Sequence, residues 1–599
     1  MQSLKKILYL LTAKERKKAV LLFIMILLMA LLDLMGVASI LPFMTVLTNP
    51  QIVETNALYN TAFQTAGMFG IKTNQEFIFA LGFLVFVLLI ISLAFKTLTI
   101  YVQLRFALMR EYSIGKRLIE GYLQQPYSWF LNRHSADLSK TILSEVSIVI
   151  AQGVKPMMNL MSQTVVIFFL IILLIFVDPK ITFIVGFTIA GAYGLIYLLT
   201  HGFLKRIGEK RLKVNQERYT VVSEAFGAAK EVKVSGLEQF YVQQFSGPAQ
   251  TFARVEGTAQ VITHLPRFAL EAIIFGGMML LVLYLMRQSG VFVDILPKIT
   301  FFAFAGYRLM PAVQQVYRAG VQLRFIEPGL DALNNDLKSL QSTILHKDKS
   351  KDVFPLNKDI TLNHIHYKYP NASRTALNDI KLRIPVRSTV GLVGTTGSGK
   401  TTMVDIILGL LEAHKGTLKV DGQVINKNNH RAWQRSIGYV PQQIFLSDDT
   451  VAANIAFGTN PKYISQEAVE RAAKIANLHE FVTNELPQQY QTNVGERGVR
   501  LSGGQRQRIG IARALHHNPK VLILDEATSA LDNLTEQAVM DAVNNLGKKI
   551  TIIMIAHRLS TVKNCDIIFL LEKGKLKAEG TFEKLIQVSD QFRKTANKL

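Results

Sequence analysis

The stretch VGLVGTTGSGKTTMVDIIL, residues 390–408, combines an apolar strand, a glycine-rich turn and the start of a helix. Its spacing matches the phosphate-binding pattern G-x-x-x-x-G-K-[ST], in the strand–turn–helix context that supports the match. The glycines let backbone N–H groups surround phosphate oxygens, and the helix N-terminus adds a favourable dipole. We therefore expect a nucleotide phosphate site made by Gly394, Thr395, Thr396, Gly397, Ser398, Gly399, Lys400, Thr401 and Thr402.

Two side chains of this stretch have particular chemistry, and a second motif supplies the acids that should face them. We expect Lys400 to neutralise the β- and γ-phosphate oxygens and the Thr401 hydroxyl to ligate Mg²⁺. Downstream, VLILDEAT (521–528) is an apolar run that ends in two carboxylates. A buried parallel strand presents its carboxyl end to the ligand crevice. Asp525 is therefore suited to Mg²⁺, directly or through water, and Glu526 to polarising the attacking water as a general base.

The first half of the chain has a different composition. Hydrophobic residues make up 49% of the 599 residues, and the long apolar runs are confined to residues 1–330. About 20 apolar residues suffice for a helix to cross the hydrocarbon core of a bilayer. Six runs reach this length, and they lie near 19–47, 77–102, 154–177, 181–203, 264–286 and 299–321.

The charge distribution orients these runs. The formal net charge is +23, but in the first half the basic residues cluster before the first run and in alternate connections. By the positive-inside rule, both ends of the membrane domain then face the cytoplasm. This placement argues against a nucleic-acid partner, and six apolar spans exclude a soluble cassette protein acting on nucleic acid. The single cysteine, Cys565, excludes an internal disulfide framework and a multi-cysteine metal site.

The connections predict further structure. Both long cytoplasmic connections alternate apolar and charged residues at helical spacing, so we expect the membrane helices to extend into the cytoplasm and turn near 124–138 and 228–238. The outer loop 48–76 should contain a short amphipathic helix on the membrane surface. We expect a membrane domain over 1–330, a polar linker over 331–352 and an α/β domain over 353–599.

Between the two nucleotide motifs lies LSGGQ, Leu501–Gln505, followed by a basic helical segment. With this motif the chain resembles the ATP-binding-cassette family, whose distinguishing signature is LSGGQ, and the resemblance extends over the whole chain. The fold class it implies is a six-helix membrane domain of the exporter type fused to an α/β P-loop NTPase domain. The activity it implies is an ATPase coupled to transport, with ATP and Mg²⁺ as cofactors.

The resemblance also assigns roles to residues that have no obvious chemistry alone. Tyr369 in YKYP looks like the aromatic residue that stacks on adenine, and Gln442 in VPQQ like the glutamine that senses Mg²⁺ and the γ-phosphate. Asp532 closes SALD, which looks like the loop between two active sites, and His557 in IAHR looks like the γ-phosphate switch. VGERG (494–498) resembles an element typical of exporters.

One nucleotide domain per chain makes the chain resemble a half-transporter, which must pair. In the family the signature closes on ATP held by the other subunit, so Ser502, Gly503, Gly504 and Gln505 should complete a partner's site. Because the site residues look intact, a homodimer with two competent sites is the economical interpretation. One departure is SADL (135–138), which stands where exporters often have a glycine followed by an acid.

The transported substrate must be inferred from ionisable residues in the apolar runs. Arg308 in AGYRLMP (305–311) lies about 15 Å from the outer end of the last run. Charges at that depth usually face a cavity and mark a substrate path. A guanidinium is also the preferred group for phosphate recognition. Lys96 has no evident partner, and Arg267 is spaced to pair with Glu271, the interpretation we favour over a substrate contact.

YRLMP, LPRFALE (265–271) and the outer-loop helix resemble the subgroup that flips lipid-linked oligosaccharides. We therefore expect an exporter or flippase that moves an amphipathic, anionic lipid-linked glycan or related lipid across a bacterial inner or plasma membrane. The alternative is an exporter of peptides or hydrophobic drugs, in which Arg308 pairs with an acid such as Asp33. An ATP-gated channel is a third possibility, and the intact Glu526 argues against it.

Overall fold

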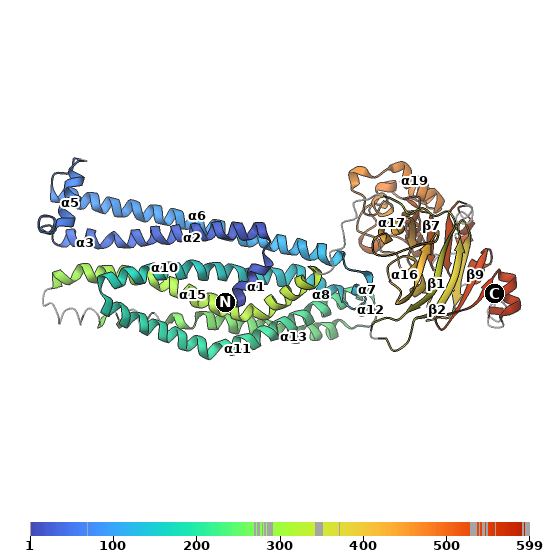
Figure 1. Cartoon of the computed structure of the whole chain (residues 1–599), viewed down its shortest axis with the longest axis horizontal. Coiled ribbons are helices and arrows are strands. Elements are labelled where there is room, and N and C mark those ends of the chain that lie inside the picture. The colour runs from blue at the N-terminus through green and yellow to red at the C-terminus, as the bar shows by residue number, and fades with distance from the viewer. Residues whose placement is uncertain are drawn as a thin grey trace. The chain divides into compact units, whose positions relative to one another are not determined.

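The computed structural model shows two units, a helical one and an α/β one, that are each compact (Figure 1). Unit 1 comprises Met1–Gln125 and Asn132–Leu345, and unit 2 comprises Pro126–Leu131 and His346–Leu599. The structure describes the whole chain except residues 1, 69, 269–270, 272–275, 278, 281–282, 284–291, 342–351, 371, 527–535, 538, 542–545, 547–548, 557–558, 590–591 and 594–599.

Unit 1 consists of helices, several of which are much longer than a bilayer requires. At 1.5 Å per residue, the 50-residue helix α6 spans about 75 Å, against about 30 Å of hydrocarbon. Its helices are α1 (Gln2–Leu10), α2 (Ala13–Ala38), α3 (Ile40–Thr48), α4 (Ile52–Thr55), α5 (Ala57–Gly67), α6 (Asn74–Leu123), α8 (Ser135–Lys140), α9 (Val146–Val149), α10 (Lys155–Val177), α11 (Pro179–Gly227), α12 (Ala229–Val234), α13 (Glu238–His264) and α15 (Phe292–Gln341), with π-helical turns η1 (Thr141–Glu145) and η2 (Ile150–Val154).

The apolar runs of the sequence correspond to these helices. In the described part of the chain, four continuous runs are long and apolar enough to cross a membrane: Ala13–Thr48, Asn74–Leu123, Ser135–Val177 and Pro179–Gly227. The sixth predicted run, 299–321, lies within α15. The fifth, 264–286, falls mostly outside the described residues. The chain thus contains an integral membrane unit.

The ends of these helices follow from capping chemistry. Thr12 and Glu15 form a capping box at the start of α2, and Thr73 and Glu76 form one at the start of α6. Each box satisfies backbone N–H groups that have no partner within the helix. The first run breaks at Ser39, between α2 and α3. Pro42 lacks the N–H that would bond the carbonyl four residues earlier, which accounts for the break.

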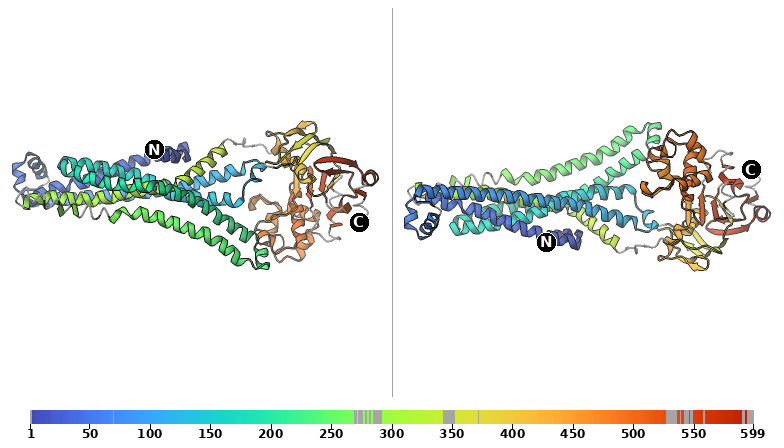
Figure 2. Two further views of the ribbon diagram at one scale, coloured as in Figure 1. Left: turned by 90° about the horizontal axis from the view of Figure 1, so that it is seen from below. Right: turned by 90° about the horizontal axis from the view of Figure 1, so that it is seen from above.

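Both turns predicted near 124–138 and 228–238 are present. The first contains α7 (Tyr127–Phe130), a single turn that belongs to unit 2, and the second contains α12. Within unit 1, the long helices run side by side, and the pair α11 and α13 diverges from α6 (Figure 2). The range predicted as a linker differs in its first part, since residues 331–341 continue α15. Leu333, Leu337 and Leu340 are buried there at helical spacing.

Unit 2 has two sheets. A four-stranded antiparallel sheet has the order β2-β1-β4-β5, and a six-stranded sheet has the order β10-β9-β3-β8-β7-β6, parallel except for β10. The strands are β1 (Asp359–Tyr367), β2 (Leu377–Pro385), β3 (Thr389–Gly394), β4 (Lys415–Val420), β5 (Gln423–Val424), β6 (Ile437–Val440), β7 (Val521–Asp525), β8 (Thr551–Ile555), β9 (Ile567–Glu572) and β10 (Lys575–Gly580).

Helices pack around these sheets, and two apolar clusters form the core of the unit. Strands β7 and β8 are buried along their whole length, as parallel strands covered on both faces are. The helices are α16 (Lys400–Ile407), α17 (His430–Arg435), α18 (Val451–Ile455), α19 (Gln466–Ile475), α20 (His479–Asn484), α21 (Gly503–Leu515), α23 (Leu559–Val562) and α24 (Phe582–Val588), with 3₁₀ turns η3 (Pro461–Tyr463), η4 (Gln489–Gln491) and η5 (Glu496–Gly498).

The order of the central strands positions the nucleotide motifs. Strand β8 separates β3 from β7, and the register aligns Leu392 with Ile555 and Ile555 with Asp525. The loop after β3 and the acids that end β7 therefore emerge at the same carboxyl edge of the sheet. This edge is where parallel α/β sheets bind their ligands.

Candidate functional site

The loop from Gly394 to Gly399 leads from β3 directly into α16. Gly399 caps α16 with φ 101°, a backbone conformation that favours glycine. A Cβ atom there would lie 2.8 Å from the carbonyl oxygen of Ala376, so the position has no room for a side chain. Thr395, Thr396 and Gly397 are exposed at the tip of the loop. The loop thus presents backbone N–H groups and a helix N-terminus to solvent.

Lys400 lies beneath this loop. Its Nζ donates hydrogen bonds to the carbonyl oxygens of Gly394 (2.8 Å) and Thr395 (3.1 Å), and the residue is 5% exposed. Burial lowers the pKa of Lys400, an effect that the charges of Glu526 and Asp525 partly offset. A buried ammonium group bonded only to neutral carbonyls is well placed to bind an anion. The hydroxyl of Ser398 is also buried and has no hydrogen-bond partner within the described part of the chain.

The acids at the end of β7 lie beside this cation. Asp525 is buried, and the Tyr439 hydroxyl donates a 3.4 Å hydrogen bond to its carboxylate. Glu526 has φ 50°, a conformation that turns the chain sharply after the strand. Gln442 Nε2 donates to Glu526 Oε2 at 2.8 Å, although the two residues are far apart in sequence. The structure therefore places Gln442 beside Glu526, and the charge of Glu526 acts on Lys400.

Two other predicted residues lie next to each other. The hydroxyl groups of Tyr369 and Thr402 are 3.0 Å apart and share a hydrogen bond, and the Tyr369 ring packs edge-on against Tyr367. Burial raises the pKa of Tyr369. Thr401 is exposed at the start of α16. The tyrosine ring is thus fixed at the first turn of the helix that follows the phosphate loop.

The LSGGQ segment forms the N-terminus of α21. Ser502 Oγ accepts a hydrogen bond from the N–H of Gln505 (3.2 Å), and Gln505 Oε1 accepts one from the N–H of Ser502 (2.8 Å). This capping box fixes the first turn and leaves Ser502 exposed. Gly503 and Gly504 have no side chains to cover that turn. The signature is thus an open helix N-terminus, a local structure that favours anions.

One acid near the phosphate loop was not among the predicted site residues. Asp405 lies on α16, and burial together with the charge of Asp525 raises its pKa to about 6. The charge of Asp405 in turn contributes to the raised pKa of Tyr439 and Tyr127. A single acid in the apolar run MVDIIL was the available signal. The predicted residues Asp532 and His557 lie outside the described residues.

The membrane unit gives Arg308 an internal partner. Arg308 Nη1 on α15 lies 2.9 Å from Asp33 Oδ1 on α2, and the Ser92 hydroxyl on α6 donates to the same carboxylate at 3.1 Å. The two side chains of the ion pair are 13% and 5% exposed. The Nε of Arg308 is buried and has no partner in the described part of the chain. Arg308 thus pairs with Asp33, the partner that the sequence analysis gave as the alternative to an anionic substrate.

The other two candidate substrate residues differ from each other. Arg267 forms an ion pair with Glu271 at 2.8 Å, which confirms the predicted helical pair. Lys96 has no such acid, and its side chain lines a small cavity of about 230 Å³ between membrane helices. Of the three, only Lys96 has no ion-pair partner within the described residues.

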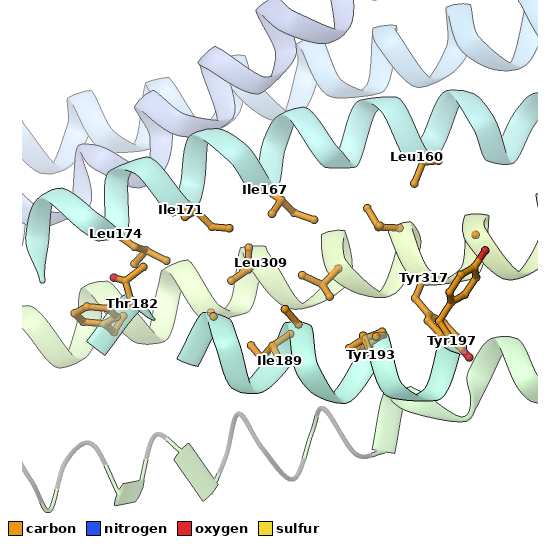
Figure 3. Close-up of a pocket in the computed structure, with 18 residues that line it drawn as sticks. Leu160, Ile167, Ile171, Leu174, Thr182, Ile189, Tyr193, Tyr197, Leu309 and Tyr317 are labelled. Atoms are coloured by element: carbon orange, nitrogen blue, oxygen red, sulfur yellow. The ribbon is translucent and has the colours of Figure 1, made fainter. Parts of the chain in front are cut away.

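A larger cavity lies between α10, α11 and α15. It has a volume of about 510 Å³, and Figure 3 shows side chains from the three helices pointing into a common space. Most of its lining is aliphatic or aromatic, and the Tyr193 hydroxyl beside it is buried without a partner among the described residues. We call it the apolar cavity; it includes Ile167, Ile171, Leu174, Ile189, Leu309 and Tyr317.

An ATPase unit and helices of bilayer length share one chain, which is the arrangement of a transporter that couples ATP hydrolysis to movement through a membrane. Profiles of the ABC transporter and of the ABC transporter transmembrane region match residues 377–529 and 19–307. The chain belongs to the ABC transporter family, and its membrane and nucleotide-binding units have the exporter arrangement.

Individual relatives match either most of the chain or a shorter part of it. The ATP-dependent lipid A-core flippase of Cupriavidus metallidurans is 30% identical over 78% of each chain. The mitochondrial ATP-binding cassette sub-family B member 10 of Mus musculus is 44% identical over 40% of this chain and 34% of its own length. A bacterial Atm1-family ABC exporter with ATP bound superimposes with a TM-score of 0.76 over 98% of this chain and 99% of that one, at 22% identity. This last likeness supports the fold.

Proposed function

We propose that this protein is an ATP-driven flippase that moves an amphipathic, anionic lipid-linked glycan or related lipid across the membrane. The observation that carries the proposal is the presence, in one membrane unit, of an apolar cavity suited to hydrocarbon and a buried guanidinium suited to phosphate. The name of the relative from Cupriavidus metallidurans, ATP-dependent lipid A-core flippase, describes a protein that flips a lipid. The same unit thus offers complementary surfaces to both ends of such a lipid.

The nucleotide site supports ATP and Mg²⁺ as its ligands. The buried ammonium of Lys400 and the α16 N-terminus would hold the β- and γ-phosphates, and Tyr369 would stack on adenine. Thr401, Gln442 and Asp525 would hold Mg²⁺, which would neutralise charge on the phosphates when bound. Glu526, oriented by Gln442, would polarise the attacking water, and His557 would contact the γ-phosphate.

We further propose that two copies of the chain form the transporter. The exposed α21 N-terminus at Ser502–Gln505 offers an anion site that would close on ATP bound at a second copy's Lys400. Asp532 would lie between the two sites. ATP binding would clamp the nucleotide units together, and hydrolysis would release them. The turns that contain α7 and α12 would pass this motion to the membrane helices.

The basic residues of alternate connections favour an orientation with the N-terminus and nucleotide units in the cytoplasm. The bacterial sources of the lipid A-core flippases favour an inner or plasma membrane. In this orientation Arg308 lies near the middle of the bilayer, held by Asp33. To bind a lipid phosphate, Arg308 would exchange the carboxylate of Asp33 for the phosphate, and its free Nε gives it a further donor.

A second candidate function, export of peptides or hydrophobic drugs, is favoured by the same Arg308–Asp33 pair, because a satisfied arginine needs no anionic substrate. Reconstituted protein distinguishes the two. We expect a polyprenyl pyrophosphate sugar to stimulate the ATPase and to be flipped, with flipping lost in Arg308→Leu and largely kept in Arg308→Lys. Stimulation by peptides or drugs and not by the lipid would overturn the flippase proposal.

A further inference from the structure

The first residues of α2, AKERKK (13–18), contain four cations and one acid. Lys14, Lys17 and Lys18 are exposed, and none of the three makes an ion pair or a side-chain hydrogen bond with another described residue. At about 3.6 residues per turn, they lie within one arc of about 100° on the helix surface. We call these three lysines the cationic patch. The patch is a concentrated positive charge that the described side chains leave unpaired.

The acid of this segment does not neutralise the cationic patch. Glu15 is the only acid in residues 1–32. It is buried, pairs with Arg110 on α6 and accepts a hydrogen bond from the backbone N–H of Thr12 at 2.8 Å. The charge of Glu15 is therefore used inside the membrane unit, and the surface of the first turns of α2 remains positive.

The backbone that carries the patch is held in place by side chains of α2 and α6. Arg16 Nε donates a hydrogen bond to the carbonyl oxygen of Leu8 on α1 (3.0 Å), and Arg117 Nη1 on α6 donates one to that of Leu10 (2.6 Å). The capping box at the start of α2 fixes the turn between α1 and α2. Binding to such a preorganised surface costs less conformational entropy than binding to a flexible tail.

An exposed apolar stripe follows the cationic patch along the same side of α2. It consists of Leu21, Ile24 and Leu28, which are 62%, 48% and 48% exposed and recur at helical spacing after Lys17. At about 1.5 Å per residue, Leu28 lies about 16 Å beyond Lys17, close to the roughly 15 Å of hydrocarbon in one leaflet. The helix thus presents positive charge at the depth of lipid headgroups and an apolar surface at the depth of the adjoining acyl chains.

We propose that the cationic patch and the apolar stripe form a binding site for an anionic phospholipid of the leaflet in which α2 begins. The lysine ammonium groups donate to the phosphate oxygens, and an acyl chain lies along the stripe. A cation beside a membrane helix attracts anionic lipid with a gain of about fivefold in affinity. The occupant is a resident bilayer lipid, so the inference stands whatever molecule the protein transports.

The test measures lipid preference at the stripe in the full-length protein reconstituted into vesicles. Ile24→Trp places a fluorophore on the stripe, about 10 Å from Lys17 along the helix, and the signal of the parent protein with its two native tryptophans is subtracted. Quenching by brominated phosphatidylglycerol is compared with quenching by brominated phosphatidylcholine over a range of mole fractions. We expect the anionic lipid to bind at least about fivefold more tightly than the zwitterionic one.

Variants of the cationic patch should change this preference according to their charge. In the Ile24→Trp protein, the triple variant Lys14→Gln/Lys17→Gln/Lys18→Gln should bring the ratio of the two affinities to about one, because it removes the charge that distinguishes the lipids. Arg at the same three positions should keep the ratio, because the charge is retained. All three positions are exposed, so the thermal midpoint should stay at the wild-type value.

The matched control removes the same charge elsewhere. Lys462→Gln/Lys474→Gln/Lys563→Gln changes three exposed lysines of unit 2 and should leave the affinity ratio at the wild-type value. An equal loss of preference in this control would show that the net charge of the protein, and not the patch, attracts the lipid, and would overturn the inference.

Three other results would also overturn it. Equal quenching by the two lipids in the Ile24→Trp protein would mean that the patch does not select anionic lipid. No quenching by either lipid would mean that protein, such as a second copy of the chain, covers the stripe. Displacement of brominated phosphatidylglycerol by a polyprenyl pyrophosphate sugar would assign the patch to the transported molecule and not to a resident phospholipid.

Discussion

Breaking the Arg308–Asp33 pair should destabilise the membrane unit, and removing both partners should restore it. The pair is 2.9 Å long and nearly buried, and among the described residues the one other hydrogen bond to it comes from the Ser92 hydroxyl. Removing one partner of a buried ion pair costs about 3–5 kcal/mol because the other charge is left unpaired. Arg308→Leu and Asp33→Leu should therefore each lower the thermal midpoint in nanodiscs, on the order of 5–10 °C for a unit of this size.

The double variant Asp33→Leu/Arg308→Leu separates structure from transport. Replacing a buried ion pair by apolar side chains is often neutral or stabilising, so the midpoint should return to near the wild-type value. If Arg308 also binds the lipid phosphate, the double variant should be stable and still fail to flip a pyrophosphate lipid. The assay is thermal unfolding of each variant alongside flipping in proteoliposomes.

Two results would refute this reasoning, one concerning stability and the other concerning transport. Equal midpoints for the wild type and both single variants would mean that the pair contributes nothing to stability. Wild-type flipping by the stable double variant would mean that Arg308 has only a structural role. Ser92→Ala is the matched control, because it removes a neutral donor to Asp33 and should cost only about 1 kcal/mol.

Three further predictions concern the nucleotide unit. Asp405→Asn should raise the thermal midpoint at pH 8 more than at pH 5. The folded-state pKa of Asp405 is about 6, above the usual 3.8, so ionising this carboxyl destabilises the wild type as the pH rises through that range. An equal gain at both pH values would contradict this. Ser502→Ala should cost about 1 kcal/mol at the α21 cap, seen as a lower midpoint, whereas Ser502→Asp should keep the cap. Lys400→Ala should weaken binding of a fluorescent ATP analogue at least tenfold, and unchanged binding would show that the buried ammonium does not hold the phosphates.

The nucleotide motifs could be predicted because each is a short contiguous stretch with its own backbone geometry. The loop 394–399 must turn from a strand into a helix, and LSGGQ contains both members of its own capping box, Ser502 and Gln505. The membrane runs and the turns near 124–138 and 228–238 could also be predicted from short stretches, since length and apolar periodicity define them. Membership of the ABC transporter family followed from these segments together.

Features that depend on distant partners could not be predicted in the same way. The sequence left Arg308 with two possible partners, and only the packing of α2, α6 and α15 brings Asp33 and Ser92 to it. In the sequence Lys96 is an excess charge, and only the packing of α2, α6, α10 and α15 shows that it lines a cavity. In the sequence, Asp405 looks like an ordinary polar residue of a helix. Its raised pKa depends on burial and on the charge of Asp525, which only the fold brings near it.

Two local features were also missed, each for an identifiable reason. Pro42 was available as a signal for the break between α2 and α3, but the apolar run continues across it without interruption. The charged residues after 331 suggested a linker, although Leu333, Leu337 and Leu340 keep the helical period and are buried. In both cases composition outweighed the backbone signal.

The most direct test of the central claim is ATP-driven movement of the lipid itself. Proteoliposomes containing the wild type should move a fluorescent polyprenyl pyrophosphate sugar between leaflets only when ATP and Mg²⁺ are supplied. Glu526→Gln should bind ATP, since Lys400 and the phosphate loop are unchanged, and should move none of the lipid. Lipid movement by Glu526→Gln at the wild-type rate, or by the wild type without ATP, would contradict the account.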